Sequence, residues 1–242
     1  ATVEIVKKID VLPKIAIQDA SPKNVDLEFR KSLFKLIAGD LRVSSHFRVE
    51  DEYLQSSYEG GPIENFLSDK KVDLILRFSV TQDLNSASAN VKLINARTGT
   101  TTSERSYVLN DKKRYPFLAH KIVSEANDQI GAPSIKWMEQ SVLFARYTEA
   151  KKSEIVLSDY TLTYQKVMVT GGLNIFPKWG NAEQNVFYYT SYNGAEPAIY
   201  RYDLKDGSRR SIISSSGMVV CSDVSKDGKK LLLTMAPKDQ TD

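Results

Sequence analysis

The residue types that most often carry acid–base, nucleophilic or metal chemistry are scarce in this chain, which has two histidines and one cysteine among 242 residues. His46 follows two serines, but no aspartate is placed to orient it and no Gly-x-Ser-x-Gly nucleophile turn occurs. His120 lies on the flank of the apolar stripe of a predicted helix, and we interpret it as a packing residue. Two histidines so far apart do not predict a metal site, and Cys221 has no second cysteine for a disulfide.

Three other patterns resemble functional motifs but favour structural roles. The pairs Gly60-Gly61 and Gly171-Gly172 lack the downstream residues of a phosphate-binding loop. The run Asp203-Leu-Lys-Asp-Gly207 is more typical of a hairpin turn than of a calcium site. The aromatic residues at 187–192 could form a sugar-binding surface, but Tyr and Phe are common in strands and we interpret them as strand residues. We therefore expect no catalytic, cofactor-binding or metal-binding residue, and the chain is not predicted to be an enzyme.

Composition and charge are those of an ordinary folded protein. Hydrophobic residues make up 41% of the chain and charged residues 26%, and 33 basic residues against 30 acidic ones give a net charge of +3. The basic residues are scattered, whereas nucleic-acid binding needs a clustered basic face, so no nucleic acid is expected as a partner. No apolar run approaches the roughly 18 residues of a membrane-spanning helix, and no signal-peptide pattern opens the chain.

The first 132 residues predict a small mixed α/β domain. The expected strands lie at residues 13–17, 72–80, 91–94 and 101–109, the last two joined as a hairpin, with a connector or short strand at 43–49. The expected helices lie at residues 25–41, 62–67 and 115–130. Ser21 and Pro22 form the expected N-terminal cap of the first helix, and Gly131 closes the last. Two helices on one face of a small sheet are enough for a compact domain.

From residue 133 onward, short strand patterns recur with a period near 44 residues. Val142 and Val186 open similar apolar runs 44 residues apart, and Ile155 and Ile199 open the next pair at the same spacing. A third copy has begun by Leu231, 45 residues after Val186. This period, with about four strands in each unit, is typical of a β-propeller blade.

The predicted architecture is therefore an α+β multi-domain chain. A mixed α/β N-terminal domain occupies residues 1–132, and residues 133–242 hold the first two antiparallel β-propeller blades and the start of a third. A propeller needs about four to eight blades to close, and an open set of blades would expose unpaired strand edges. We expect this chain to be a piece of a longer protein whose remaining blades complete the ring.

Six segments carry a resemblance to a known family. In the first domain they are residues 36–47 (LIAGDLRVSSHF), 72–76 (VDLIL), 91–99 (VKLINARTG) and 119–125 (AHKIVSE), and in the second they are residues 176–179 (FPKW) and 199–204 (IYRYDL). Over almost its whole length the chain resembles the TolB family, the periplasmic propeller proteins of the Tol–Pal system. The resemblance implies six blades in the full protein.

The resemblance also implies a non-catalytic periplasmic scaffold without a cofactor. Its expected partners are Pal, the peptidoglycan-associated lipoprotein, which the propeller binds, and the C-terminal domain of TolA, which an N-terminal arm binds. Together these proteins support outer-membrane integrity and cell division. A start at Ala1 would fit a periplasmic protein from which the signal peptide has been removed.

Carried over by position, the arm covers about residues 1–12, and its expected partner-binding residues are Val3, Glu4, Ile5, Val6 and Ile9. Apolar Val3, Ile5 and Ile9 alternate with charged residues, so the arm could add as a strand to the sheet edge of a partner. The same alternation is compatible with pairing inside the sheet of its own domain. Both arrangements remain open from the sequence.

An enzyme that uses a propeller as a platform is the alternative. A hydrolase of the prolyl-oligopeptidase kind needs an α/β domain that carries Ser, Asp and His, and a propeller lyase needs a metal or base site, whereas residues 133–242 contain no histidine. Under this alternative the chain is a fragment whose active site lies outside it. Binding to Pal and to the TolA domain separates the two hypotheses, and turnover of peptides or polyuronates would favour the enzyme.

Overall fold

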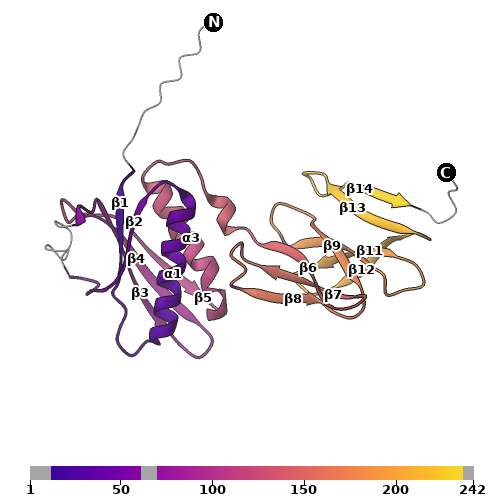
Figure 1. Cartoon of the computed structure of the whole chain (residues 1–242), viewed down its shortest axis with the longest axis horizontal. Helices are drawn as coiled ribbons and strands as arrows, with labels where there is room; N and C mark the ends of the chain where they lie inside the picture. Colours follow the sequence, from indigo (N-terminus) through magenta and orange to yellow (C-terminus); the bar gives the residue numbers. More distant parts are fainter. Residues whose placement is uncertain (1–11, 61–69, 237–242) are drawn as a thin grey trace, which may run out of the picture. The chain divides into compact units, whose positions relative to one another are not determined.

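The chain divides into two compact units, Ala1–Glu139 (unit 1) and Gln140–Asp242 (unit 2). The computed structural model describes residues 12–60 and 70–236 of them (Figure 1). The predicted arm, apart from Leu12, and the predicted helix at residues 62–67 lie outside the described residues.

Unit 1 is built on a five-stranded mixed sheet with the order β2-β1-β3-β4-β5. Its strands are β1 (Lys14–Asp19), β2 (Arg48–Gln55), β3 (Leu74–Gln82), β4 (Ala87–Asn95) and β5 (Thr101–Leu109). Strand β1 is parallel to both of its neighbours, whereas β3, β4 and β5 form antiparallel pairs, which confirms the predicted hairpin. The three parallel strands therefore begin at one end of the sheet, where the β4–β5 turn also lies.

Helices α1 (Leu27–Ser44) and α3 (Tyr115–Gln129) contact each other and cover one face of the sheet, and the 3-10 helices η1 (Lys112–Arg114) and η2 (Lys136–Glu139) flank α3 (Figure 1). The predicted cap of α1 was wrong. Asp26, not Ser21, caps the helix, because its side chain accepts a hydrogen bond from the Glu28 amide at 2.9 Å. The Ser21 hydroxyl accepts instead from the Val80 amide at 3.0 Å, which ties the preceding loop to β3.

Both helices end near the starts of the parallel strands. Helix α1 stops one residue before Ser45, which has a φ of 60°, and α3 stops two residues before Gly131, which has a φ of 66°. Glycine adopts this left-handed backbone with little strain because it has no Cβ, and Gly131 closes α3 as predicted. The C-terminal ends of both helices thus gather where β1, β2 and β3 begin.

Several buried polar side chains of unit 1 are paired with one another. Arg30 Nε donates to Asp19 Oδ2 at 2.7 Å, and the Tyr53 hydroxyl donates to the same carboxylate. Burial together with this hydrogen bond raises the pKa of Tyr53 to about 12. Arg77 is 1% exposed and donates from Nε to Gln18 Oε1 at 2.9 Å. Because an unpaired buried polar group is costly, these contacts fix β1 to α1, β2 and β3.

Unit 2 contains three antiparallel sheets in its described part. The first holds β6 (Val142–Glu149), β7 (Lys152–Ser158) and β8 (Gln165–Val169), in that order. The second holds β9 (Asn174–Trp179), β10 (Val186–Ser191), β11 (Ala198–Asp203) and β12 (Arg209–Ser214). The third holds β13 (Met218–Val224) and β14 (Leu231–Ala236). Within each sheet, strands that are consecutive in the chain are neighbours.

The predicted repeat is visible in the strand positions. Strands β6 and β10 begin 44 residues apart, and so do β8 and β12 and also β9 and β13. These successive antiparallel sheets confirm the predicted fold class. The first sheet has three strands among the described residues, fewer than the four expected. Strand β6 is an edge strand there, whereas its counterpart in the repeat, β10, pairs with β9 in the second sheet.

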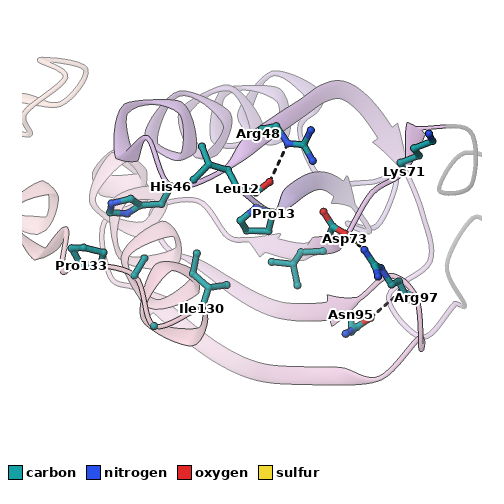
Figure 2. A pocket seen from close by; sticks show the side chains of 13 residues that line it. Leu12, Pro13, His46, Arg48, Lys71, Asp73, Asn95, Arg97, Ile130 and Pro133 are labelled. Carbon is teal, nitrogen blue, oxygen red and sulfur yellow. Dashed lines mark hydrogen bonds and ion pairs between the residues drawn. The ribbon is translucent and has the colours of Figure 1, made fainter. Parts of the chain in front are cut away.

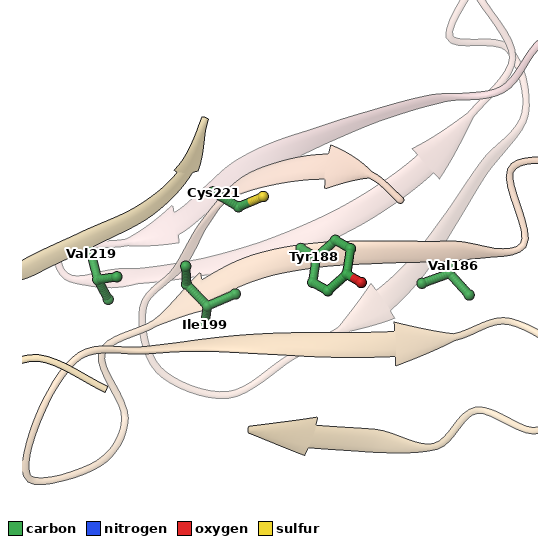
Figure 3. Close-up of a cluster of buried hydrophobic side chains, with 5 residues drawn as sticks. All are labelled: Val186, Tyr188, Ile199, Val219 and Cys221. Atoms are coloured by element: carbon green, nitrogen blue, oxygen red, sulfur yellow. The ribbon is translucent and has the colours of Figure 1, made fainter. Parts of the chain in front are cut away.

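Strand β10 is buried along its full length and contributes to two cores. On one face, Val186 and Tyr188 pack with Ile199, Val219 and Cys221, which joins the second sheet to β13 (Figure 3). On the other face, Phe187 and Tyr189 pack with Ile155 and Val169 of the first sheet. Successive side chains of a strand point to opposite faces, so one strand supplies both contacts.

Candidate functional site

The two histidines occupy structural positions in unit 1. His120 is 0% exposed and its Nδ1 lies 2.6 Å from Asp40 Oδ2, so the pair joins α3 to α1. His120 is therefore a packing residue, as predicted, but the aspartate that orients it was not predicted. No substrate can reach a pair so completely buried. His46, in the α1–β2 connection, lies with its Nδ1 2.7 Å from Asn127 Oδ1.

Cys221 and the aromatic run belong to the interior of unit 2. Cys221 is 4% exposed, and burial raises the pKa of its thiol, which makes it a small packing residue. Phe187, Tyr188 and Tyr189 are each at most 7% exposed. The ring of Phe187 stacks on that of Tyr202 with centroids 4.8 Å apart. The aromatic residues therefore form blade cores, not a sugar-binding surface.

The Gly171-Gly172 pair and the run from Asp203 to Gly207 form turns, whereas Gly61 lies outside the described residues. Asp203 Oδ1 accepts from the Lys205 amide at 3.1 Å and Asp206 Oδ1 from the Ser208 amide at 2.8 Å, as in a hairpin turn. Gly171 and Gly172 have φ values of 84° and 67° in the β8–β9 turn. Among the described residues, no three His, Cys, Asp or Glu side chains are grouped closely enough to hold a metal ion. None of the helices in the described part of the chain is long and apolar enough to traverse a membrane.

The predicted partner-binding residues Val3, Glu4, Ile5, Val6 and Ile9 lie outside the described residues. The structure describes the chain from Leu12, whose side chain is 40% exposed. The Pro13 carbonyl accepts from the Arg48 amide at 3.0 Å, and β1 then runs between β2 and β3. The arm is thus connected to a strand that already has neighbours on both sides.

These features define a class of protein. A small α/β domain is followed by consecutive antiparallel blades, and His120 and Cys221 are buried inside the two units. Comparison with known proteins then gives the family.

The family model for the TolB amino-terminal domain matches residues 1–102. The chain is 43% identical to the Tol-Pal system protein TolB of Wolinella succinogenes over 100% of its own length and 57% of the relative. It is 44% identical to the corresponding protein of Campylobacter jejuni over 98% of its own length and 54% of the relative. The crystal structure of TolB from Acinetobacter baumannii shares the fold, with a TM-score of 0.65 and 19% identity over 95% of this chain and 56% of that one.

Residues 1–102 therefore belong to the family of TolB amino-terminal domains, and over its whole length the chain is similar to Tol-Pal system TolB proteins. It spans a little over half the length of the curated relatives it matches.

Proposed function

We propose that this chain acts in the periplasm as a non-catalytic scaffold of the Tol–Pal system. In this proposal the blades at residues 133–242 contribute to the surface that binds Pal, and the arm of the domain at residues 1–132 binds the C-terminal domain of TolA. The assembly would support outer-membrane integrity and cell division. The observation that carries the proposal is the 43% identity, over the whole chain, to a Tol-Pal system protein.

The chemistry of the described residues supports a binding role. The Asp40–His120 pair is sealed inside unit 1, and Cys221 is buried inside unit 2. The second sheet is held from both faces by packed side chains, which makes a rigid base for the loops that connect its strands. Loops on a rigid scaffold are common binding surfaces.

Titration calorimetry of the intact chain with purified Pal and with the TolA C-terminal domain tests the proposal. We expect Ile5→Asp to weaken TolA binding by at least about tenfold, because the apolar face of an added strand fills pockets of the partner. Pal binding should not change in this variant. Glu4→Gln, on the opposite face of the arm, is the matched control and should have a smaller effect. Failure to bind either partner at roughly micromolar concentration, or turnover of peptide substrates, would contradict the scaffold function.

A further inference from the structure

A cavity of about 960 Å³ opens in unit 1 at the end of the sheet where β1, β2 and β3 begin (Figure 2). Its walls come from five stretches that are far apart in the sequence: the residues before β1, the α1–β2 connection, the residues before β3, the β4–β5 turn and the chain after α3. This volume is at the upper end of the roughly 300–1,000 Å³ that is usual for ligand sites. The fold therefore builds a recess large enough for several groups of a ligand.

One side of the cavity is mainly apolar and lies at the C-terminal ends of the helices. Ile130 and Pro133, from the chain after α3, lie on this side together with His46 (Figure 2). Asn127 holds the wall in place, because its Oδ1 accepts from His46 Nδ1 at 2.7 Å and its Nδ2 donates to the Pro133 carbonyl at 2.9 Å. The negative ends of two helix dipoles meet here, so this side disfavours an anion.

The other side of the cavity is basic. Arg48, Lys71 and Arg97 line it, and Asp73 is the one carboxylate among the described lining residues (Figure 2). Asp73 is already engaged, since its Oδ2 accepts from the Lys14 amide at 2.9 Å and its Oδ1 from Arg97 Nη2 at 2.8 Å. Neither Arg48 nor Lys71 forms an ion pair with any residue that the structure describes. Arg48 Nε donates to the Leu12 carbonyl at 3.0 Å, but no carboxylate in the described part of the chain lies within ion-pair distance of Arg48 or Lys71, so both cations can pair with an acidic group of a ligand.

Because one side of the cavity is apolar and the other is basic, the lining favours some classes of ligand over others. A metal ion is disfavoured by three cations against one engaged carboxylate. A compact phosphate could pair with the basic side chains, but it would leave the apolar side of the cavity without a contact. A ligand with an apolar group at one end and carboxylates at the other meets both sides at once. An extended peptide has this form, because its side chains differ in character along a flexible backbone.

We propose that this cavity binds an extended peptide segment of a partner protein, in which an aliphatic side chain is followed by acidic residues. The aliphatic side chain packs against Ile130 and Pro133. The acidic side chains pair with Arg48 and Lys71. The cavity lies within unit 1 and is lined at one edge by Leu12, where the predicted arm ends, so it adds a further contact to the proposed scaffold.

Fluorescence anisotropy of the intact chain tests the proposal with a labelled synthetic peptide in which a leucine precedes a run of glutamates. A second peptide carries glutamine in place of each glutamate. We expect the glutamate peptide to bind more tightly and to lose affinity as salt is added, because exposed charges are screened. The double variant Arg48→Glu with Lys71→Glu should weaken it at least about tenfold, since two attractive contacts become repulsive.

The matched control is Lys23→Glu with Lys113→Glu, which makes the same change in charge at two exposed lysines outside the cavity. Its affinity should change less than about twofold, because the overall charge is equal and only the position differs. Ile130→Ser should weaken both peptides, whereas Leu84→Ser, at a residue that is 84% exposed in the β3–β4 turn, should not. Circular dichroism checks the fold of each variant, and Lys71→Gln replaces the double variant if that variant is unfolded.

Equal binding of the two peptides, or an unchanged affinity in the Arg48 and Lys71 variants, would overturn the proposal. Displacement of the probe by a free peptide with the sequence of residues 1–11 would assign the cavity to the chain's own N-terminal segment and would also overturn it. None of these outcomes depends on Pal or TolA, so the cavity and the scaffold function succeed or fail separately.

Discussion

Buried charged and polar side chains are the points at which single substitutions should have the largest effect on unit 1. Asp40 and His120 lie 2.6 Å apart with at most 1% of either side chain exposed, and Asp19 and Arg30 lie 2.7 Å apart with similar burial. Removing one partner leaves the other group in a low-dielectric interior without water to replace the contact. The pairs therefore link α1 to α3 and to β1, and breaking either pair is costly.

Asp40→Ala should lower the free energy of unfolding of unit 1 by about 3 kcal/mol, because His120 loses its buried contact with the Asp40 carboxylate. Urea denaturation followed by tryptophan fluorescence measures this change. Asp128→Ala is the control on α3: its side chain is 40% exposed and 3.9 Å from Lys136 Nζ. We expect a loss below about 0.5 kcal/mol there. Equal losses in the two variants would contradict the role assigned to the buried pair.

Asp73 should make stability depend on acid pH. The Lys14 amide and then Arg97 hold the pKa of this carboxyl below its usual range. A carboxyl with a depressed folded-state pKa contributes stability above its ordinary value, about 4, and loses that contribution as the pH falls through the folded value. Asp73→Asn should therefore be less stable than the parent at neutral pH, and the difference should shrink below about pH 4.

Thermal unfolding between neutral and acid pH measures that difference. Asp83→Asn, at an exposed loop acid, is the control and should show little change at any pH. A difference between Asp73→Asn and the parent that stays constant down to acid pH would show that the charge of Asp73 does not carry the effect.

The sequence predicted the burial of single residues better than their partners. The helical stripe identified His120 as a packing residue, and the apolar neighbours of Cys221 identified its burial. Asp40 is 80 residues from His120 in the chain, and a periodic pattern reveals which face is buried but not which polar group lies opposite. The cavity residues were missed for the same reason, because they come from five separate segments without a shared motif.

At the scale of the elements, turns carry the strictest requirements for particular residues. Asn193, in the β10–β11 turn, holds the β8–β9 turn: its side chain accepts from the Leu173 amide at 2.9 Å and donates to the Gly171 carbonyl. A Cβ on Gly172 would lie 1.5 Å from Asn193 Oδ1, whereas a Cβ on Gly171 would meet nothing within 4 Å. Both glycines have positive φ, so alanine would be strained at either position, but only at Gly172 would it also collide with Asn193.

Gly172→Ala should lower the free energy of unfolding of unit 2 by about 2 to 3 kcal/mol, because it adds backbone strain and displaces Asn193 from both hydrogen bonds. Gly171→Ala, which adds the strain alone, should have an effect of about 1 kcal/mol. Denaturant titration of the two variants beside the parent measures both. A larger loss in Gly171→Ala than in Gly172→Ala would contradict the role of Asn193.

Most strands of unit 1 were predicted closely, and the edge strand β2 was not. The predicted strand at residues 72–80 corresponds to β3 (Leu74–Gln82), and the hairpin corresponds to β4 and β5. Strand β2 (Arg48–Gln55) extends six residues past the expected connector at 43–49. Its sequence, RVEDEYLQ, is rich in charge because an edge strand is partly open to solvent and charge protects it from further pairing.

At the scale of the whole molecule, each unit has its own core and its own tryptophan. Trp137 lies in η2 of unit 1, and Trp179 ends β9 of unit 2, where its Nε1 donates to the Ser141 carbonyl at 3.0 Å. The chain has two tryptophans in all. Removing either one leaves a fluorescent reporter in the other unit alone.

We expect the two units to respond separately to destabilisation. In a Trp179→Phe background, Asp40→Ala should shift the unfolding transition reported by Trp137, and Gly172→Ala should leave it in place. In a Trp137→Phe background, Gly172→Ala should shift the unfolding transition reported by Trp179, and Asp40→Ala should leave it in place. Tryptophan fluorescence in urea measures all four variants. Equal shifts of both reporters by either substitution would mean that the units unfold as one cooperative body.

The repeat period was the strongest predictor of the architecture, but it did not predict which strands pair within one sheet. Equal spacing of similar strands predicted successive blades, and the starts of β6 and β10 keep that spacing. Spacing alone does not say which strand of a unit begins a sheet. Strand β9 follows β8 in the chain yet pairs with β10, so the three-stranded first sheet could be assigned only from backbone pairing.

Because β10 serves two cores, the chain can change length in some places and not in others during evolution. Deleting one residue inside β10 would exchange the side chains that face the first sheet with those that face β13. The turns between strands carry no such constraint. The starts of β9 and β13 are 44 residues apart, whereas the starts of β10 and β14 are 45 residues apart. The third repeat therefore has one residue more than the second between the starts of these two strands, that is, between Met218 and Leu231. Here β13 carries a register shift between Cys221 and Asp223, and insertions in other family members should likewise collect at bulges and turns.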